Sequence, residues 1–212
     1  ISGAVLCNKL LATLADAEDS MKPEVYAQYV GELEVLRSYY YYMLFDCFGR
    51  IPSLEEFVDK TEPLMEPEQV WSHLVNCLER NAPHMAVVTD ANRAANYGRV
   101  TQGFAYALLA RLYLNAESFG CTPENISLAD NNAYRSDFVK VQSATDFYTN
   151  AVACCDMVIN SGSYAIEDDW FANFKIDNSD SKENIFVIVE NGNGEFDLRY
   201  IGSMSNKLRV PI

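Results

Sequence analysis

GELEVLRSYYYYMLFDCFGRIP, residues 31–52, predicts a helix that is buried over most of its circumference. Glu34 and Arg37 lie three residues apart and can pair on the polar strip that remains. Gly49 tolerates the left-handed conformation that ends many helices, and Pro52 forbids helical continuation. Apolar side chains recur every three or four residues and occupy two neighbouring faces: Leu33, Val35, Leu36, Tyr39, Tyr40, Tyr42, Leu44 and Cys47.

Proline positions and apolar spacing predict further helices on both sides of this stretch. Pro23 suits a first helical turn, so the central helix begins near it and ends near Phe48. Pro67 opens another helix, which ends at residues 81–83. Apolar residues at steps of three and four predict three more helices, over residues 4–15, 101–117 and 143–160.

The predicted inner faces of the later helices differ in composition. The helix over 101–117 has a stripe of Ala105, Leu108, Leu109, Leu112 and Ala116. The helix over 143–160 is predicted to bury Ala144, Tyr148, Ala151, Val152, Cys155 and Ile159. Antiparallel helix pairs with small residues at their contacts indicate tetratricopeptide-like packing.

The pattern changes after Gly162, which is placed to cap the preceding helix. Residues 185–189, IFVIV, are short and β-branched and predict a buried strand. A strong turn signal, NGNG, follows at residues 191–194. The fold class is therefore mainly α: a tetratricopeptide-like helical array over about residues 1–162, with a small strand and loop region over about 163–212, all within one domain.

Composition limits the classes of partner. The chain has 212 residues and a formal net charge of −14, which disfavours nucleic acid. No run of 18 apolar residues occurs, so no transmembrane helix is predicted. The six cysteines form no C-x-x-C pair, and we interpret them as unpaired buried thiols. The chain begins at Ile1 without a Met, and we expect it to be a segment of a longer protein.

The sequence contains no established catalytic or metal-binding motif. His73 and His84 are isolated, and H-E-x-x-H, G-x-S-x-G and Walker patterns do not occur. Residues 167–169 and Asp177, Asp180 and Glu183 could supply acid–base pairs or calcium ligands, but we favour a solvated acidic face, since such residues are usually exposed. The EF-hand pattern fails after Asp177, because Lys182 stands where the loop needs Gly. No motif supports a calcium ion on the oxygens of Glu190, Asn191, Asn193 or Asp197. We therefore predict no catalytic residue, no metal site and no cofactor.

Aromatic residues point to a different kind of site. The chain has 13 Tyr, 11 Phe and 2 Trp, and aromatic faces can stack on the apolar faces of sugar rings while amides and guanidinium groups bind hydroxyls. Residues 190–206 follow the predicted strand as a loop and combine both kinds of group. We predict that this loop binds ligand through Tyr200, Arg199, Asn193 and Asn191.

Four motifs occur in order between residues 31 and 189. They are LRSYYYY (36–42) with FGRIP (48–52), GRVT (98–101) with AYALLARLYL (105–114), CDMVINSGSY (155–164), and SKENIF (181–186). This ordered set resembles the SusD/RagB family, the nutrient-binding lipoproteins of the bacterial outer membrane. Phe104 departs from the pattern, because the family usually has a small residue there, and Ser38 stands in place of Ala.

The resemblance implies a function that the residues alone do not. It implies a non-catalytic receptor on the cell surface, held at the outer membrane by a lipid anchor outside this segment. Its partner would be a SusC-like, TonB-dependent β-barrel transporter, and its ligand an oligosaccharide or a peptide. Two alternatives remain: a soluble tetratricopeptide-like scaffold that binds peptides, and an α-helical carbohydrate-active enzyme with a carboxylate pair in a cleft. An upstream lipoprotein signal would distinguish the receptor from the scaffold.

Overall fold

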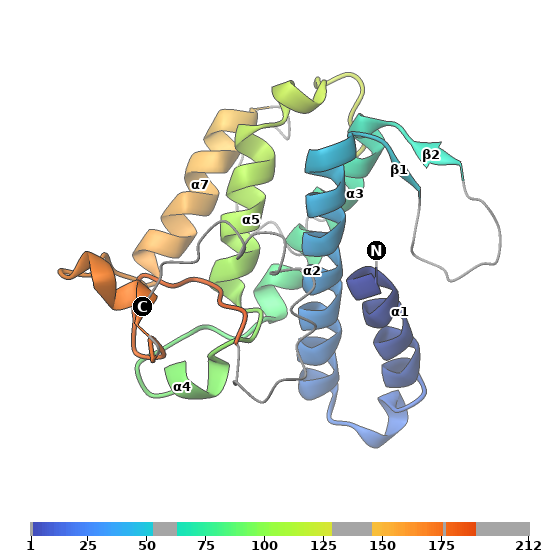
Figure 1. Ribbon diagram of the computed structural model, residues 1–212. Coiled ribbons are helices and arrows are strands. Elements are labelled where there is room, and N and C mark those ends of the chain that lie inside the picture. Colours follow the sequence, from blue (N-terminus) through green and yellow to red (C-terminus); the bar gives the residue numbers. More distant parts are fainter. Residues whose placement is uncertain (1, 53–62, 129–145, 176, 190–212) are drawn as a thin grey trace, which may run out of the picture.

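The computed structural model describes residues 2–52, 63–128, 146–175 and 177–189, and within them the chain is mainly helical (Figure 1). Its long helices pack in chain order, each against the next, and alternate in direction. This arrangement confirms the predicted mainly α, helical-array fold class. The long helices are α1 (Ser2–Ala15), α2 (Pro23–Phe48), α3 (Pro67–Asn81), α5 (Gln102–Leu114) and α7 (Phe147–Asn160).

Short elements lie at the two ends of this array (Figure 1). At the end where α2 finishes, β1 (Ile51–Pro52) pairs antiparallel with β2 (Leu64–Met65). At the other end lie α4 (Arg93–Asn96) and the segment 163–189, which contains the 3₁₀ turn η4 (Trp170–Phe174). Three further 3₁₀ turns are described: η1 (Glu18–Ser20), η2 (Ala82–His84) and η3 (Glu117–Phe119).

The central helix α2 forms as its sequence predicts. It begins at Pro23 and ends at Phe48, and Gly49 follows with a φ of +70°. It lies between α1 and α3, so it is buried on opposite sides. Within the tyrosine run, Tyr41 and Tyr42 are buried and the other two are half-buried. A wide apolar stripe therefore does correspond to an interior helix.

Trp71 on α3 lies at the centre of the core and has no exposed surface. Its indole Nε1 donates to the Leu112 carbonyl of α5 at 2.9 Å, which satisfies the buried donor. The ring packs edge-on against Tyr113 and Phe147, with centroids 5.5 and 5.3 Å away. The Tyr113 hydroxyl in turn donates to the buried carboxylate of Glu79 on α3. These contacts join α3, α5 and α7.

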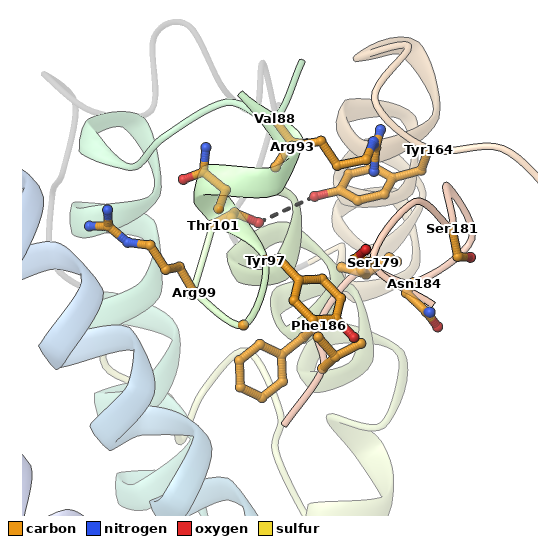
Figure 2. Close-up of a pocket in the computed structure, with 14 residues that line it drawn as sticks. Val88, Arg93, Tyr97, Arg99, Thr101, Tyr164, Ser179, Ser181, Asn184 and Phe186 are labelled. Atoms are coloured by element: carbon orange, nitrogen blue, oxygen red, sulfur yellow. Dashed lines mark hydrogen bonds between the residues drawn. The ribbon is translucent and has the colours of Figure 1, made fainter. Parts of the chain in front are cut away.

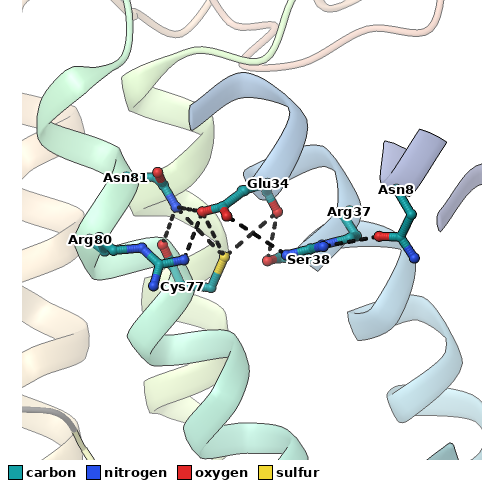
Figure 3. Close-up of polar contacts among 7 residues, drawn as sticks. All are labelled: Asn8, Glu34, Arg37, Ser38, Cys77, Arg80 and Asn81. Carbon is teal, nitrogen blue, oxygen red and sulfur yellow. Dashed lines mark hydrogen bonds and ion pairs between the residues drawn. The ribbon is translucent and has the colours of Figure 1, made fainter. Parts of the chain in front are cut away.

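Glu34, predicted to pair with Arg37 on the polar strip of α2, lies at the junction of α2 with α3 (Figure 3). One carboxylate oxygen accepts from Arg80 Nη2 at 2.8 Å and from Asn81 Nδ2 at 2.5 Å. The predicted pair with Arg37 is present, with a 3.8 Å N···O separation. Arg37 continues to α1, where its Nη1 donates to Asn8 Oδ1 at 2.9 Å. One polar network therefore connects three helices.

The predicted inner face of α7 was wrong. Ala151 is buried as expected, but Tyr148, Val152 and Ile159 are 54%, 60% and 68% exposed, and Cys155 is also exposed. Ala144 lies outside the described residues. The side chains that α7 buries are Phe147, Asn150, Ala151 and Cys154. Apolar residues surround this helix, so periodicity did not choose a face, and the packing of Phe147 on Trp71 does.

The strand predicted over residues 185–189 is also wrong, because these residues form no ladder. Within the described parts of the chain, the β structure is the β1–β2 pair alone. The segment is held instead by Phe186. The centroid of its ring lies 4.6 Å from that of Phe104 on α5 and 6.0 Å from that of Tyr39 on α2. A β-branched run fits a half-buried surface of any kind, so its composition did not require a neighbouring strand. The predicted boundary near residue 162 stays a prediction.

The cysteines follow their prediction in part. All six are unpaired; Cys7, Cys77, Cys121 and Cys154 are buried, whereas Cys47 and Cys155 are exposed. Burial raises the pKa of the Cys121 thiol to about 12, so this thiol is protonated at neutral pH. In the parts of the chain that the structure describes, no helix has the length and apolarity needed to cross a membrane.

Glu34 makes stability depend on acidity. Burial alone would raise the pKa of Glu34, but hydrogen bonds from Arg80 and Asn81 and the charges of Arg80 and Arg37 outweigh it and lower the pKa. A carboxyl with a lowered folded-state pKa stabilises the fold above its unfolded pKa, about 4.3, and this stabilisation is lost as the pH falls through the folded value. Glu34→Gln should lower the free energy of unfolding at pH 7 by about 1–3 kcal/mol and flatten the loss of stability below pH 5. Urea melts at several pH values measure both.

Asp90→Asn serves as the control for that change. Asp90 also accepts an ion pair, from Lys182 Nζ at 2.8 Å, but its side chain is 77% exposed. Solvent screens an exposed pair, which then contributes little to stability, so this variant should stay close to wild type. Equal stability of the Glu34→Gln variant and wild type at pH 7 would show that the network does not hold α2 to α3.

Candidate functional site

The predicted ligand-binding residues Tyr200, Arg199, Asn193 and Asn191 lie outside the described residues. Their assignment stays a prediction. The described chain ends at Val189, at the end of the array where α4 lies.

A small polar cavity separates the loop before α5 from the segment 163–187 (Figure 2). Across it, Thr101 Oγ1 and the Tyr164 hydroxyl share a hydrogen bond of 3.2 Å. The Tyr97 hydroxyl donates to Asn178 Oδ1, and Ser163 Oγ donates to the Val88 carbonyl at 2.6 Å. These bonds attach the segment after α7 to the loop between α3 and α5.

The size of this cavity decides what it can hold. Its volume is about 30 Å³, which is enough for one or two waters. Pockets for small-molecule ligands span about 300–1,000 Å³, so a sugar ring does not fit. Arg93 Nε and Asn184 Nδ2 line this region and are buried donors without a protein acceptor, and a water can satisfy them. We interpret the cavity and the hydrogen bonds around it as a structural contact between these two segments, and we name this contact the polar seam.

A larger groove of about 460 Å³ runs between α1, α2 and the loop before α5. Arg99 and Glu32 form a two-point ion pair at its wall, with N···O distances of 2.7 and 3.2 Å. The Arg99 guanidinium also lies 5.8 Å from the centre of the Tyr29 ring. The remaining lining is mainly aliphatic: Leu10, Leu14, Leu33, Leu36 and Val100. Such a wall offers few partners for sugar hydroxyls.

The turn η4 exposes three aromatic side chains. Trp170, Phe171 and Phe174 are 68%, 67% and 69% exposed. The Trp170 ring lies 5.1 Å from the Phe171 ring and 5.0 Å from the Phe174 ring, at interplanar angles of 80° and 47°. Asp169 caps the turn by accepting from the Phe171 N–H at 3.0 Å. We name Trp170, Phe171 and Phe174 the aromatic turn.

Polar groups fix the aromatic turn from its other side. Asn173 Nδ2 donates to Glu183 Oε2 at 2.9 Å, and Asn173 Oδ1 accepts from Ser181 Oγ at 2.5 Å. The Glu167 N–H donates to the same Glu183 oxygen at 3.2 Å. The Asn173 hydrogen bond is the main cause that lowers the pKa of Glu183, so this carboxylate is ionised at neutral pH. The turn thus combines exposed rings with amide and carboxylate groups in the same short segment, a combination that can bind sugars.

The sequence analysis did not identify the aromatic turn. Its signal was available as WFANF at residues 170–174, three aromatic residues within five, directly after three carboxylates. Exposure distinguishes these rings from core aromatics, and periodicity cannot report exposure in a short turn. Of the two histidines, His73 packs edge-on to Tyr41, with centroids 6.3 Å apart. No group of three or more His, Cys, Asp or Glu in the described residues is arranged to bind a metal ion.

Comparison with known proteins decides the fold. No family model matches the chain, and no curated protein matches it either. Solved structures do. Surface glycan-binding protein A from Bacteroides uniformis is 25% identical with a TM-score of 0.64, and that from Bacteroides fluxus is 24% identical with a TM-score of 0.61. A SusD-like protein from Bacteroides fragilis is 17% identical with a TM-score of 0.63. The chain has a SusD-like fold.

The SusD-like match covers most of this chain but only part of each neighbour. The alignments cover 87%, 86% and 87% of this chain for the B. uniformis, B. fragilis and B. fluxus proteins. They cover 35%, 30% and 34% of those chains, so this chain spans about a third of their length. The resemblance predicted from the four ordered motifs is confirmed at the level of the fold.

The motifs of this SusD-like chain meet in space. Tyr39 of the first motif packs edge-on against Phe104 at 5.5 Å, and both contact Phe186 of the fourth motif. The second and third motifs meet where Tyr164 approaches Gly103, because a Cβ at that glycine would lie 2.4 Å from the Tyr164 ring. Phe104, which departs from the family pattern, therefore serves as one member of an aromatic trio.

Gly98 makes the closest approach to the C-terminal end of the described chain. Its φ is +77°, and a Cβ there would lie 2.5 Å from Val189 Cγ2. Because valine is stiff at χ1, it cannot rotate away freely. Gly98→Ala should therefore lower the free energy of unfolding by about 2–4 kcal/mol, which combines backbone strain and overpacking. Hydrogen exchange at residues 185–189 should rise at the same time.

Gly49→Ala is a matched control for that variant. Gly49 has a φ of +70°, and no atom lies within 4 Å of its virtual Cβ. This variant carries the backbone strain alone, about 1–2 kcal/mol. If the two variants lose the same stability and residues 185–189 exchange as in wild type, Val189 does not pack on Gly98.

Proposed function

We propose that this chain is part of a non-catalytic, cell-surface glycan-binding protein of the SusD type. The observation that carries the proposal is the SusD-like fold that it shares with two surface glycan-binding proteins. The exposed aromatic turn supports it, because solvent-exposed rings beside amide and carboxylate groups offer stacking and hydrogen bonding together. Binding of this kind rests on shape and polarity and requires no bond cleavage.

The proposal places the ligand on the aromatic turn, with Trp170 as its largest stacking surface. The loop predicted from the sequence, with Tyr200, Arg199, Asn193 and Asn191, follows the same segment along the chain. We propose that this loop contributes hydroxyl-binding groups to the same ligand. The polar seam of Figure 2 holds the segment in place and does not bind the glycan itself.

The family resemblance supports the finer parts of the proposal. The protein would be an outer-membrane lipoprotein whose anchor lies outside this segment. It would deliver oligosaccharides to a SusC-like, TonB-dependent transporter. Purification of the full-length protein from outer membranes under mild detergent, followed by mass spectrometry of co-purifying β-barrels, tests this partner. Recovery of the full-length protein only from the soluble fraction would favour the scaffold alternative.

Replacing the main stacking ring should weaken glycan binding without affecting folding. In the full-length protein, Trp170→Ala should lower affinity for the glycan that binds by roughly 5- to 150-fold, the effect of losing about 1–3 kcal/mol at a hot spot. The melting temperature should stay near wild type, because the ring is 68% exposed. Isothermal titration with a panel of purified polysaccharides, alongside melting curves, measures both quantities.

Two further variants make that experiment decisive. Ile166→Ala removes an 88% exposed aliphatic side chain from the same segment and should change neither quantity. Tyr200→Ala should lower affinity by a similar factor if the loop shares the ligand. Loss of affinity in Tyr200→Ala with none in Trp170→Ala would move the site into the loop. A marked fall in the melting temperature of Trp170→Ala would make the aromatic turn a buried contact of the full-length protein.

The absence of catalysis is tested in the same panel. The full-length protein should release no new reducing ends from any polysaccharide that it binds, because binding by stacking and hydrogen bonds requires no bond cleavage. Prolonged incubation followed by a reducing-end assay measures this. Product release that disappears on replacing a single carboxylate would identify an enzyme instead.

A further inference from the structure

The segment that carries the aromatic turn is strongly acidic. Residues 163–189 contain six carboxylates and two ammonium groups, and no arginine. The carboxylates belong to Glu167, Asp168, Asp169, Asp177, Asp180 and Glu183. Two of them, Asp168 and Asp169, directly precede Trp170 in the chain. A ligand that stacks on the aromatic turn therefore meets a segment with an excess of four negative charges, six carboxylates against two ammonium groups.

The two ammonium groups of this segment are occupied. Lys182 Nζ lies 2.8 Å from Asp90 Oδ1, and Lys175 Nζ lies 3.5 Å from Asp169 Oδ2. The neighbouring guanidinium of Arg93 donates to the Ser163 carbonyl and lies 3.9 Å from Asp90 Oδ1. In the described part of the segment, each cation thus lies within 4 Å of a carboxylate, which offsets its charge.

The carboxylates closest to the rings are held in place by hydrogen bonds. Asp169 accepts from the backbone of the aromatic turn, and Glu183 accepts from Asn173 within the turn at 2.9 Å. Glu167 Oε1 accepts from the Lys182 N–H at 2.7 Å. These hydrogen bonds favour the observed positions of the carboxylates. Asp168 is exposed and follows Glu167 directly, so it adds a further charge at the border.

We propose that the aromatic turn selects neutral glycans and rejects polyanionic ones, such as uronate-rich or sulfated polysaccharides. This inference rests on the proposed glycan-binding function. Like charges placed side by side at an interface oppose binding, and the chain's formal net charge of −14 adds a longer-range repulsion. A neutral sugar makes the same stacking contacts without that repulsion.

The experiment compares two ligands that share one backbone. A neutral polysaccharide that the full-length protein binds is converted to its sulfated or carboxymethylated derivative, and both affinities are measured in 50 and 500 mM NaCl. At low salt the derivative should bind on the order of tenfold more weakly. The difference should shrink at high salt, because the Debye length falls from roughly 14 to 4 Å.

Charge variants locate the repulsion. Asp168→Asn removes one carboxylate beside the aromatic turn and should reduce the neutral-to-anionic affinity ratio by at least twofold. Asp156→Asn makes the same change of net charge on the exposed surface of α7 and should leave the ratio as in wild type. The ratio, measured within each variant, is insensitive to small losses of overall affinity.

The outcomes separate this inference from the function on which it rests. Equal binding of the neutral and anionic ligands, or binding of anionic glycans alone, overturns the selectivity and leaves glycan binding intact. The anionic ligand could also bind more weakly by a factor that changes neither with salt nor in the Asp168→Asn variant. That result would indicate steric exclusion and would also overturn the charge-based selectivity. Failure of every neutral glycan to bind, or full binding by the Trp170→Ala variant, overturns the proposed site and the selectivity together.

Discussion

The helical array depends on a carboxylate held between its two central helices. Glu34 of α2 binds Arg80 and Asn81 at the end of α3, and through Arg37 the same network reaches Asn8 of α1. The hydrophobic effect is non-directional, so apolar contacts specify a register less sharply than a set of hydrogen bonds does. A buried charge does not tolerate a shift of register, since it loses its partners at once. The network therefore fixes the register in which α1, α2 and α3 meet.

A fixed register at one side of the array determines the position of the candidate site at the other. Trp71 of α3 fixes α5 through the Leu112 carbonyl and α7 through Phe147. The segment after α7 then reaches back across the loop before α5, where Tyr164 meets Thr101 and Gly103. The aromatic turn follows within ten residues of Tyr164, so its place is set by contacts made in the seam.

The sequence predicted those elements whose boundaries are marked by chemistry. Pro23, Gly49 and Pro67 each mark a backbone constraint, and α2 and α3 begin or end where these residues stand. The sequence did not predict which face of α7 is buried, because Tyr148 and Phe147 both carry a large aromatic ring and tertiary packing decides which ring is buried. The prediction of a strand over 185–189 was wrong for a related reason. A β-branched composition favours a half-buried surface but does not require a neighbouring strand to pair with. The candidate site was missed because exposure is a property of the fold.

The aromatic turn differs from the other aromatic clusters in what keeps it ordered. The rings of Tyr39, Phe104 and Phe186 are held by one another, so removing any one leaves a cavity in the core. Trp170 and its two neighbours are held by the backbone beneath them, through the Asp169 cap and the bonds of Asn173. Their ring faces therefore contribute little to folding, and large exposed apolar groups of this kind usually mark a contact surface. A turn ordered by polar bonds can present aromatic faces to solvent without relying on their burial, and this is the property that a sugar-stacking surface requires.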